Sequence, residues 1–278
     1  METMREKSQS GNADPESWSA CFRRVVRDYA GRCAAPFEFL GGVALVLPMV
    51  FKRRGIRWRD LYYYFDLCGV RSLLTVIMIS MLMGAVMALQ AAMQMRKFGT
   101  EIFVVDLVAY ATVKEFGPLM VAVIAIGRAG SAFAAEIGTM KVNEEISALQ
   151  TLGIRPEAHL VLPKLLAMLV ALPVLTIFGD AAGLLGGMFV GVGYLDLPPS
   201  VYFERTFAVL NCPTLMLGIA KGIPFSVLIT LAGCYCGFTA SGDALGVGRG
   251  ATRAVVLSIF LITVADAVLA VLYSFIGY

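Results

Sequence analysis

Two long apolar runs constrain the fold of this chain more than any other feature of its sequence. Residues 72–95 are 24 consecutive positions without a charged side chain, and residues 254–278 contain one charge, Asp266, in 25 positions. A helix rises about 1.5 Å per residue, so about 20 apolar residues match the hydrocarbon core of a bilayer. The runs therefore predict an all-α fold, that of a polytopic helical membrane protein.

The overall composition agrees with a membrane protein and excludes several other classes. Of the 278 residues 58% are hydrophobic and only 15% are charged, well below the quarter typical of soluble domains. The net charge of +3 is too small and too dispersed to indicate nucleic-acid binding. A single histidine, His159, leaves no paired Cys/His set for a metal, and no phosphate-binding P-loop motif occurs. We therefore expect no metal site, no cofactor and no catalytic residues in this chain.

The order of polar and apolar segments predicts three regions. Residues 1–33 are expected to form a disordered cytoplasmic tail, and residues 34–66 an interfacial amphipathic or re-entrant segment, since the uncharged run 39–51 is too short to span. Residues 67–278 are expected to form the membrane domain. Its five transmembrane helices are predicted at about 72–95, 102–135, 165–195, 206–240 and 254–277.

The distribution of cations predicts how these spans are oriented. With the N-terminus in the cytoplasm, eleven Lys and Arg residues lie on the inner flanks and loops, against three on the outer side. Because cytoplasmic loops are enriched in cations, the N-terminus is predicted inside and the C-terminus outside. The inner set is Lys52, Arg53, Arg54, Arg57, Arg59, Arg71, Lys141, Arg155, Lys164, Arg249 and Arg253.

The loop between the second and third spans is predicted to contain a short amphipathic helix. Asn143 is expected to cap it, Glu144 and Glu145 suit the positive end of the helix dipole, and Gly153 ends it. An apolar stripe follows helical spacing at Val142, Ile146, Leu149 and Leu152. This coupling helix is predicted to dock a cytoplasmic partner; the alternative is a helix that rests on lipid headgroups.

Five charged residues are predicted near the middle of spans, where each costs about 2.5–3.5 kcal/mol. They are Lys114, Glu115, Asp180, Lys221 and Asp266. Lys221 and Asp266 are predicted to form a buried charge pair. Lys114 and Glu115 either contact a lipid headgroup or pair with other charges of the protein, and both alternatives remain open at this point.

Small residues recur every fourth position in the third span, at Gly179, Gly183, Gly187 and Gly191. Such a face lets helix backbones approach closely. We expect it to pack within one subunit, with a dimer seam as the alternative.

Three motifs in residues 114–142 resemble those of the MlaE/YrbE permease family, the membrane subunits of MCE-type lipid ABC transporters. The motifs are KEFGP (114–118), GRAGSA (127–132) and AEIGTMKV (135–142), and residues 60–278 follow the family in order and spacing. The motif residues expected to be structural are Gly117, Pro118, Gly127, Arg128, Gly130, Glu136 and Gly138. One departure is Lys114, where the family commonly has arginine, which binds phosphate through two parallel hydrogen bonds.

The resemblance implies a non-catalytic permease subunit in the bacterial inner membrane. It implies a homodimer with a lipid cavity, a separate ABC ATPase that binds ATP and Mg, an MCE-domain hexamer outside and often a STAS-domain protein. The implied function is phospholipid transfer between the inner membrane and the MCE proteins. The lipid cavity is expected to involve Lys114, Glu115, Arg249 and Arg253, and the ATPase contact Glu144, Glu145, Ile146 and Leu149.

A second function class remains open from the sequence. Buried carboxylates are also typical of ion- or proton-coupled secondary transporters. The two readings differ in their energy source, because the first requires a separate ATPase and the second does not.

Overall fold

In a computed structural model of the protein, the structure describes residues 58–100 and 102–275. These residues form helices and no strand. The predicted tail 1–33 and residues 34–57 of the predicted interfacial segment lie outside the described residues. Residues 58–66 of that segment form helix α2 (Trp58–Phe65) and the start of a π-helical turn, Asp66–Val70, which leads directly into α3 (Arg71–Met95).

Five candidate spans in the described part are long and apolar enough to cross a membrane, as predicted. Their bounds are Trp58–Phe98, Phe103–Val142, Glu157–Tyr194, Cys212–Phe238 and Ala244–Phe275. Several helices extend beyond the predicted spans, because hydropathy marks the apolar portion of a helix and not its ends. The fourth span is shorter than the predicted 206–240, because residues 206–209 belong to a separate short helix. The prediction of an all-α polytopic membrane protein is confirmed.

The second span is one continuous helix with two local changes of winding. It consists of α4 (Phe103–Ala111), the π-helical turn Thr112–Phe116, α5 (Gly117–Ala125), the π-helical turn Ile126–Gly130 and α6 (Ser131–Val142). Pro118 lies in the first turn of α5, where its missing N–H is tolerated. π-Helical turns in α-helices often occur at functional sites; the first of these turns carries Lys114 and Glu115.

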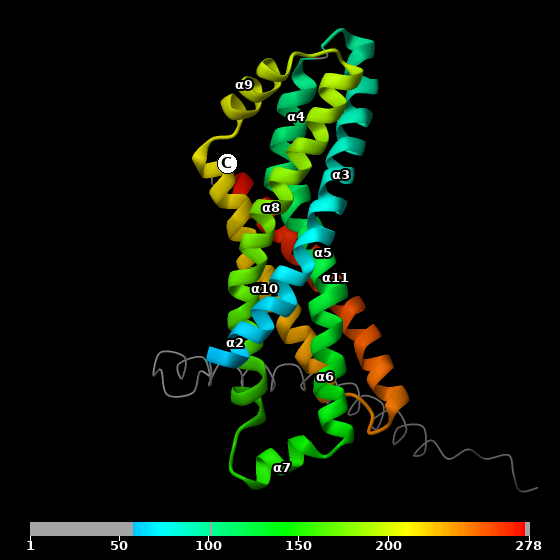
Figure 1. The fold of residues 1–278 in the computed structure, drawn as a ribbon, viewed down its shortest axis with the longest axis vertical. Helices are drawn as coiled ribbons and strands as arrows, with labels where there is room; N and C mark the ends of the chain where they lie inside the picture. The colour runs from blue at the N-terminus through cyan, green and yellow to red at the C-terminus, as the bar shows by residue number, and fades with distance from the viewer. Residues whose placement is uncertain (1–57, 101, 276–278) are drawn as a thin grey trace, which may run out of the picture. The chain divides into compact units, whose positions relative to one another are not determined.

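The remaining helices are joined at opposite ends of the long spans (Figure 1). At one end, α7 (Glu145–Thr151) connects α6 to the turn Glu157–Val161 and α8 (Leu162–Tyr194). At the other end, α9 (Pro199–Val209) connects α8 to α10 (Cys212–Phe238). The last helix is α11 (Ala244–Phe275), which packs on α10 and α6.

Helices α3 and α8 form the most extensive helix–helix contact of the described residues. The buried face of α3 repeats every four residues and is built of small side chains, at Ser72, Val76, Ser80, Gly84, Ala88 and Ala92. A Cβ atom on Gly84 would collide with the Gly183 carbonyl, and one on Gly186 would collide with the Met81 carbonyl. The glycine-rich face of α8 therefore packs within the same subunit, as expected.

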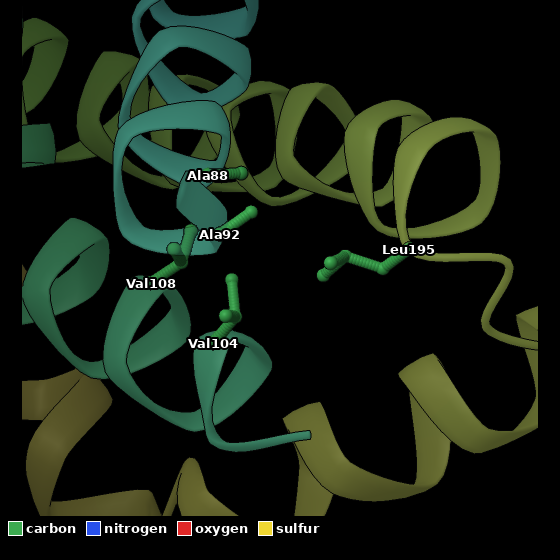
Figure 2. Close-up of a cluster of buried hydrophobic side chains, with 5 residues drawn as sticks. All are labelled: Ala88, Ala92, Val104, Val108 and Leu195. Atoms are coloured by element: carbon green, nitrogen blue, oxygen red, sulfur yellow. The ribbon is translucent and has the colours of Figure 1, made fainter. Parts of the chain in front are cut away.

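An apolar cluster closes the α9 end of the structure. Ala88 and Ala92 of α3 face Val104 and Val108 of α4, with Leu195 beside them (Figure 2). Helix α9 is attached nearby, because the Tyr202 hydroxyl donates a hydrogen bond of 3.1 Å to the Leu184 carbonyl of α8.

A buried cation joins three elements toward the α7 end. Lys164 of α8 is fully buried, and its Nζ donates to the Tyr64 hydroxyl of α2 at 2.9 Å and to Glu136 of α6 at 3.1 Å. The Tyr64 hydroxyl in turn donates to the same Glu136 oxygen at 2.6 Å. The orientation argument from the sequence counted Lys164 as a loop cation; the structure corrects this, because Lys164 lies inside the helix bundle.

Candidate functional site

A buried lysine connects three elements in the membrane-spanning part of the protein. Lys221 of α10 is fully buried, and its Nζ donates hydrogen bonds to Glu115 of the π-helical turn and to Asp266 of α11. The Lys221–Asp266 distance is 2.9 Å. The sequence predicted the Lys221–Asp266 pair, and the structure adds Glu115 as a second acceptor. We call Glu115, Lys221 and Asp266 the charged trio.

The charges of the charged trio do not cancel, and two of its three side chains are partly exposed. With both carboxylates ionised it carries one positive and two negative charges. The Lys221 side chain has no exposed surface, whereas the side chains of Glu115 and Asp266 are 34% and 16% exposed. The remaining negative charge is therefore accessible from outside the bundle, where it can attract a cation.

Lys114 lies next to Glu115 in the chain but has different partners. Its Nζ donates a hydrogen bond of 2.5 Å to the Tyr110 hydroxyl and lies 4.8 Å from the centre of the Tyr110 ring. Among the described residues no carboxylate lies within ion-pair distance of Lys114. A half-buried cation in a spanning helix without an anionic partner is costly, and it can be stabilised by an anion from outside the chain.

The structure does not bring Arg249 and Arg253 to Lys114 and Glu115. Both arginines are exposed near the beginning of α11, and Arg253 precedes Asp266 by 13 residues on the same helix, about 20 Å at helical rise. The chain therefore does not gather the four residues at one point, and the expectation that all four line a lipid cavity stays a prediction. The sequence could not show this, because the motifs fix which residues occur and not the depth at which each side chain lies.

The motif residues of the second span have distinct structural positions. Glu136 is the acceptor for Tyr64 and Lys164, and Arg128 donates to the Arg71 carbonyl at the start of α3. The Gly130 backbone lies against Gly233 of α10. A Cβ atom on Gly233 would stand 2.8 Å from the Gly130 carbonyl oxygen.

The other motif glycines differ in how tightly they are packed. A Cβ atom on Gly117 would collide with Asp180, and one on Gly138 would make ordinary contacts with Val247 and Ala240. Gly127 faces open space within its own chain. Close packing therefore explains Gly117, whereas it does not explain Gly127.

The predicted coupling helix is present as α7, with changes at both its beginning and its apolar face. Asn143 is the C-terminal cap residue of α6 and does not cap α7. The residue that precedes α7 is Glu144, whose backbone is left-handed, with φ 60°. Ile146 is buried within the subunit, and Leu149 is half-buried. Ile146 thus contributes to the protein's own packing instead of an open docking stripe. Leu152, just after the helix, is 73% exposed.

Glu145 remains on the surface, where its carboxylate accepts a hydrogen bond of 3.2 Å from the Asn143 amide. Glu144 is also exposed. The outer surface of this loop therefore presents two carboxylates and two large apolar side chains, Leu152 and the less exposed Ile154.

Comparisons with known proteins agree across most of the described residues. The family model described as Permease MlaE matches residues 61–272, which include the charged trio and α7. A "Probable ABC transporter permease protein" of Rickettsia typhi is 36% identical over 232 residues, covering 84% of this chain and 87% of that protein.

Two further relatives come from photosynthetic organisms. A "Probable ABC transporter permease protein" of Synechocystis is 30% identical over 211 residues, covering 76% of this chain and 80% of that protein. The chloroplastic protein TRIGALACTOSYLDIACYLGLYCEROL 1 of Arabidopsis thaliana is 29% identical over 214 residues, covering 77% of this chain and 61% of that protein.

Proposed function

Because this chain belongs to the MlaE permease family, whose curated relatives include ABC transporter permeases, we propose that it moves phospholipid as the membrane subunit of an ABC transporter. ATP hydrolysis is assigned to a separate subunit that binds ATP and Mg. The name of the Arabidopsis relative refers to a diacylglycerol lipid, and this supports a lipid substrate.

Lys114 is the observation that carries the lipid assignment. It is a half-buried cation in a spanning helix, and it contacts the hydroxyl and ring of Tyr110. A phospholipid supplies the missing counter-charge through its phosphate, while its acyl chains remain in an apolar environment. The accessible negative charge of Glu115 and Asp266 can accept an ammonium group if the headgroup carries one.

We expect Lys114→Gln to reduce the phospholipid that co-purifies with the protein several-fold, because glutamine lacks the charge that attracts phosphate. Lys114→Arg should retain phospholipid, since the guanidinium keeps the charge and binds phosphate through two hydrogen bonds. The measurement is phospholipid per permease by mass spectrometry, with crosslinking as a second readout. Lys97→Gln, at an exposed position outside the helix bundle, is the matched control. Normal lipid occupancy and transport by Lys114→Gln would contradict the assignment.

The proposed assembly follows from the family and from the position of the coupling helix. We place the protein in the bacterial inner membrane as a homodimer, with the N-terminus and α7 in the cytoplasm and the C-terminus in the periplasm. The ATPase, with a STAS-domain protein in some systems, contacts the cytoplasmic side. An MCE-domain hexamer receives or delivers lipid on the periplasmic side.

We expect Leu152→Asp to abolish co-purification of the ATPase while the permease accumulates normally. Leu152 is the most exposed large apolar side chain of the α7 loop, so burying a charge there in an interface is costly. Gln150→Asp is the control, since Gln150 is exposed two residues away, on the opposite side of the turn. Ile146→Asp is not a suitable test, because it would disturb the loop itself. An unchanged yield of the complex with Leu152→Asp would mean that the loop rests on lipid.

Ion- or proton-coupled secondary transport is the other function class. Of its candidate carboxylates, Glu115 and Asp266 are both bound by Lys221, and the family match favours the ABC transporter. Transport by the chain alone in liposomes without ATP would favour the alternative.

A further inference from the structure

Asp180 is a carboxylate inside the spanning helices that belongs neither to the charged trio nor to any other ion pair of the described residues. Asp180 of α8 is 5% exposed, and its Oδ1 has no hydrogen-bond partner among the described residues. By contrast, Asp106, Glu115, Glu136 and Asp266 each have a lysine or arginine partner. An isolated buried carboxylate is so costly that it either acquires a cation or becomes neutral.

Among the described residues, the cations on the elements packed against α8 lie beyond ion-pair distance of Asp180. Arg71 pairs with Asp66, Lys221 with Glu115 and Asp266, and Arg205 of α9 with Asp106 of α4, whereas Lys114 donates to the neutral Tyr110 hydroxyl. On α8 itself, Lys164 pairs with Glu136. The charges of α2, Arg59 and Asp60, belong to the helix that packs on the first part of α8, around Leu166 to Val170. In the described part of the chain, no cation is therefore placed to neutralise Asp180.

The surroundings of Asp180 contain further oxygens instead of positive charge. The carboxylate oxygen lies directly against Gly117, at a place that a Cβ atom would occupy. The Thr112 carbonyl oxygen is 2.9 Å from that same place. The hydroxyls of Ser80 and Thr112 are buried and have no hydrogen-bond partner among the described residues. An ionised Asp180 would thus lie near the Thr112 carbonyl oxygen, which can only accept hydrogen bonds, with neutral hydroxyls and no cation to offset its charge.

The available space decides which ligand can satisfy this carboxylate. The small cavity nearby, which Gly117 and Gly179 help to line but Asp180 itself does not, has a volume of about 10 Å³. Its other lining residues are Ser80, Thr112, two further glycines, three methionines and a phenylalanine. This volume corresponds to one water molecule and is too small for a lipid headgroup. A bare metal cation of the hard type needs about six oxygen ligands, whereas these walls supply two hydroxyls among methionine and glycine. A proton requires neither the space nor the ligands.

We propose that Asp180 is a proton-binding site of the membrane domain, occupied at neutral pH, whose carboxylic acid keeps α8 packed against Gly117. Gly117 begins α5 directly after the turn that carries Lys114 and Glu115. Loss of the proton would place a charge against this backbone and separate the two helices. The state of Asp180 therefore sets the position of the turn that contributes Glu115 to the charged trio.

A hydrophobic carbodiimide tests this directly in membranes that contain the full-length protein. A carboxylic acid O–H adds across one C=N bond of the reagent, its proton goes to nitrogen, and the O-acylisourea rearranges to a stable N-acylurea. Peptide mass spectrometry at about pH 6 should find the adduct on Asp180, whereas ion-paired Glu115 and Asp266 serve as internal controls that remain unmodified. The labelling should decrease as the pH rises and disappear in Asp180→Asn. Labelling of Asp180 that stays the same from about pH 6 to alkaline pH would overturn the proposal.

The Asp180→Asn variant provides a second and independent readout. Asparagine has nearly the same shape and is neutral, so we expect normal accumulation and an unchanged Tm at neutral pH. At high pH the native protein should lose thermal stability and the variant should not. Asp266→Asn is the matched comparison and should lower the Tm, since it removes a partner of Lys221. A large loss of accumulation by Asp180→Asn would show that the ionised form is required. A Tm increase with sodium but not potassium, in the native protein only, would assign the site to a metal ion; either result overturns the proposal.

Discussion

Replacing Lys221 with methionine should prevent normal accumulation of the protein, the largest effect that we expect from a single substitution. Lys221 is fully buried and is the cation that Glu115 and Asp266 share. Methionine has a similar length without the charge, so two carboxylates would remain in the membrane without compensation. Removing one partner from a buried ion pair costs about 3–5 kcal/mol, a large fraction of the stability of most domains.

The same argument predicts that neutralising the carboxylates as well restores accumulation of the protein. Lys221→Met combined with Glu115→Gln and Asp266→Asn removes all three charges, and a buried ion cluster replaced by neutral groups is often tolerated. The triple variant should accumulate better than Lys221→Met, with the two double variants between them. Accumulation in membranes and the Tm in mild detergent provide the measurements, and Lys97→Met is the exposed control. Normal accumulation of Lys221→Met would show that the charged trio does not stabilise the fold.

The second large effect is expected at the contact between α3 and α8. Gly186→Ala should lower the stability markedly and Gly186→Leu should abolish folding, because the added Cβ atom would collide with the backbone carbonyl of Met81. Overpacking of this kind typically costs about 1–3 kcal/mol, and here the helix backbones themselves must separate.

A glycine elsewhere on α8 gives the matched control for this prediction. A Cβ atom on Gly193 would meet nothing within 4 Å, so Gly193→Ala should be neutral or slightly stabilising through helix propensity, by at most about 1 kcal/mol. Gly187→Ala should have an intermediate effect, because its Cβ atom would stand 2.7 Å from the movable Tyr202 hydroxyl. Thermal unfolding in mild detergent ranks the three variants. Equal effects of Gly186→Ala and Gly193→Ala would show that the close approach is not required.

Local sequence patterns predicted which segments form helices better than they predicted how those helices begin and which side chains they bury. The coupling helix is a good example, because residues 145–151 do form a helix. Asn143 was expected to cap it, but α6 continues to Val142, and Asn143 is the cap residue at the C-terminal end of α6. Ile146 was expected on an open stripe, yet the loop folds so that this side chain is buried. Periodicity identifies one apolar face and does not say whether the protein itself or a partner covers it.

Two sets of contacts were not predicted from the sequence, although the sequence contains an ambiguous pattern for each of them. The buried face of α3 repeats every four residues, in the same way as the glycines of α8, and this repeat marks the strongest helix contact. The network of Lys164, Tyr64 and Glu136 gave a weaker signal. A lysine near the end of an apolar run is normally an interfacial cation, so burial could not be inferred from its position.

The sequence by itself determined the class of the protein, its five apolar spans, its family and the presence of charged residues within those spans. These follow from composition, from the length of a helix that crosses a bilayer and from motifs that are contiguous in the chain. The sequence suggested the Lys221–Asp266 pair, but only the tertiary structure decided the full set of charges that meet. Lys221 reaches Glu115 and Asp266 from helices far apart in the sequence, whereas Arg253 lies about 20 Å from Asp266 on the same helix. The physical reason is that partner choice depends on the rotation and depth of each packed helix, and these are fixed by contacts such as Gly186 with Met81 and Gly117 with Asp180.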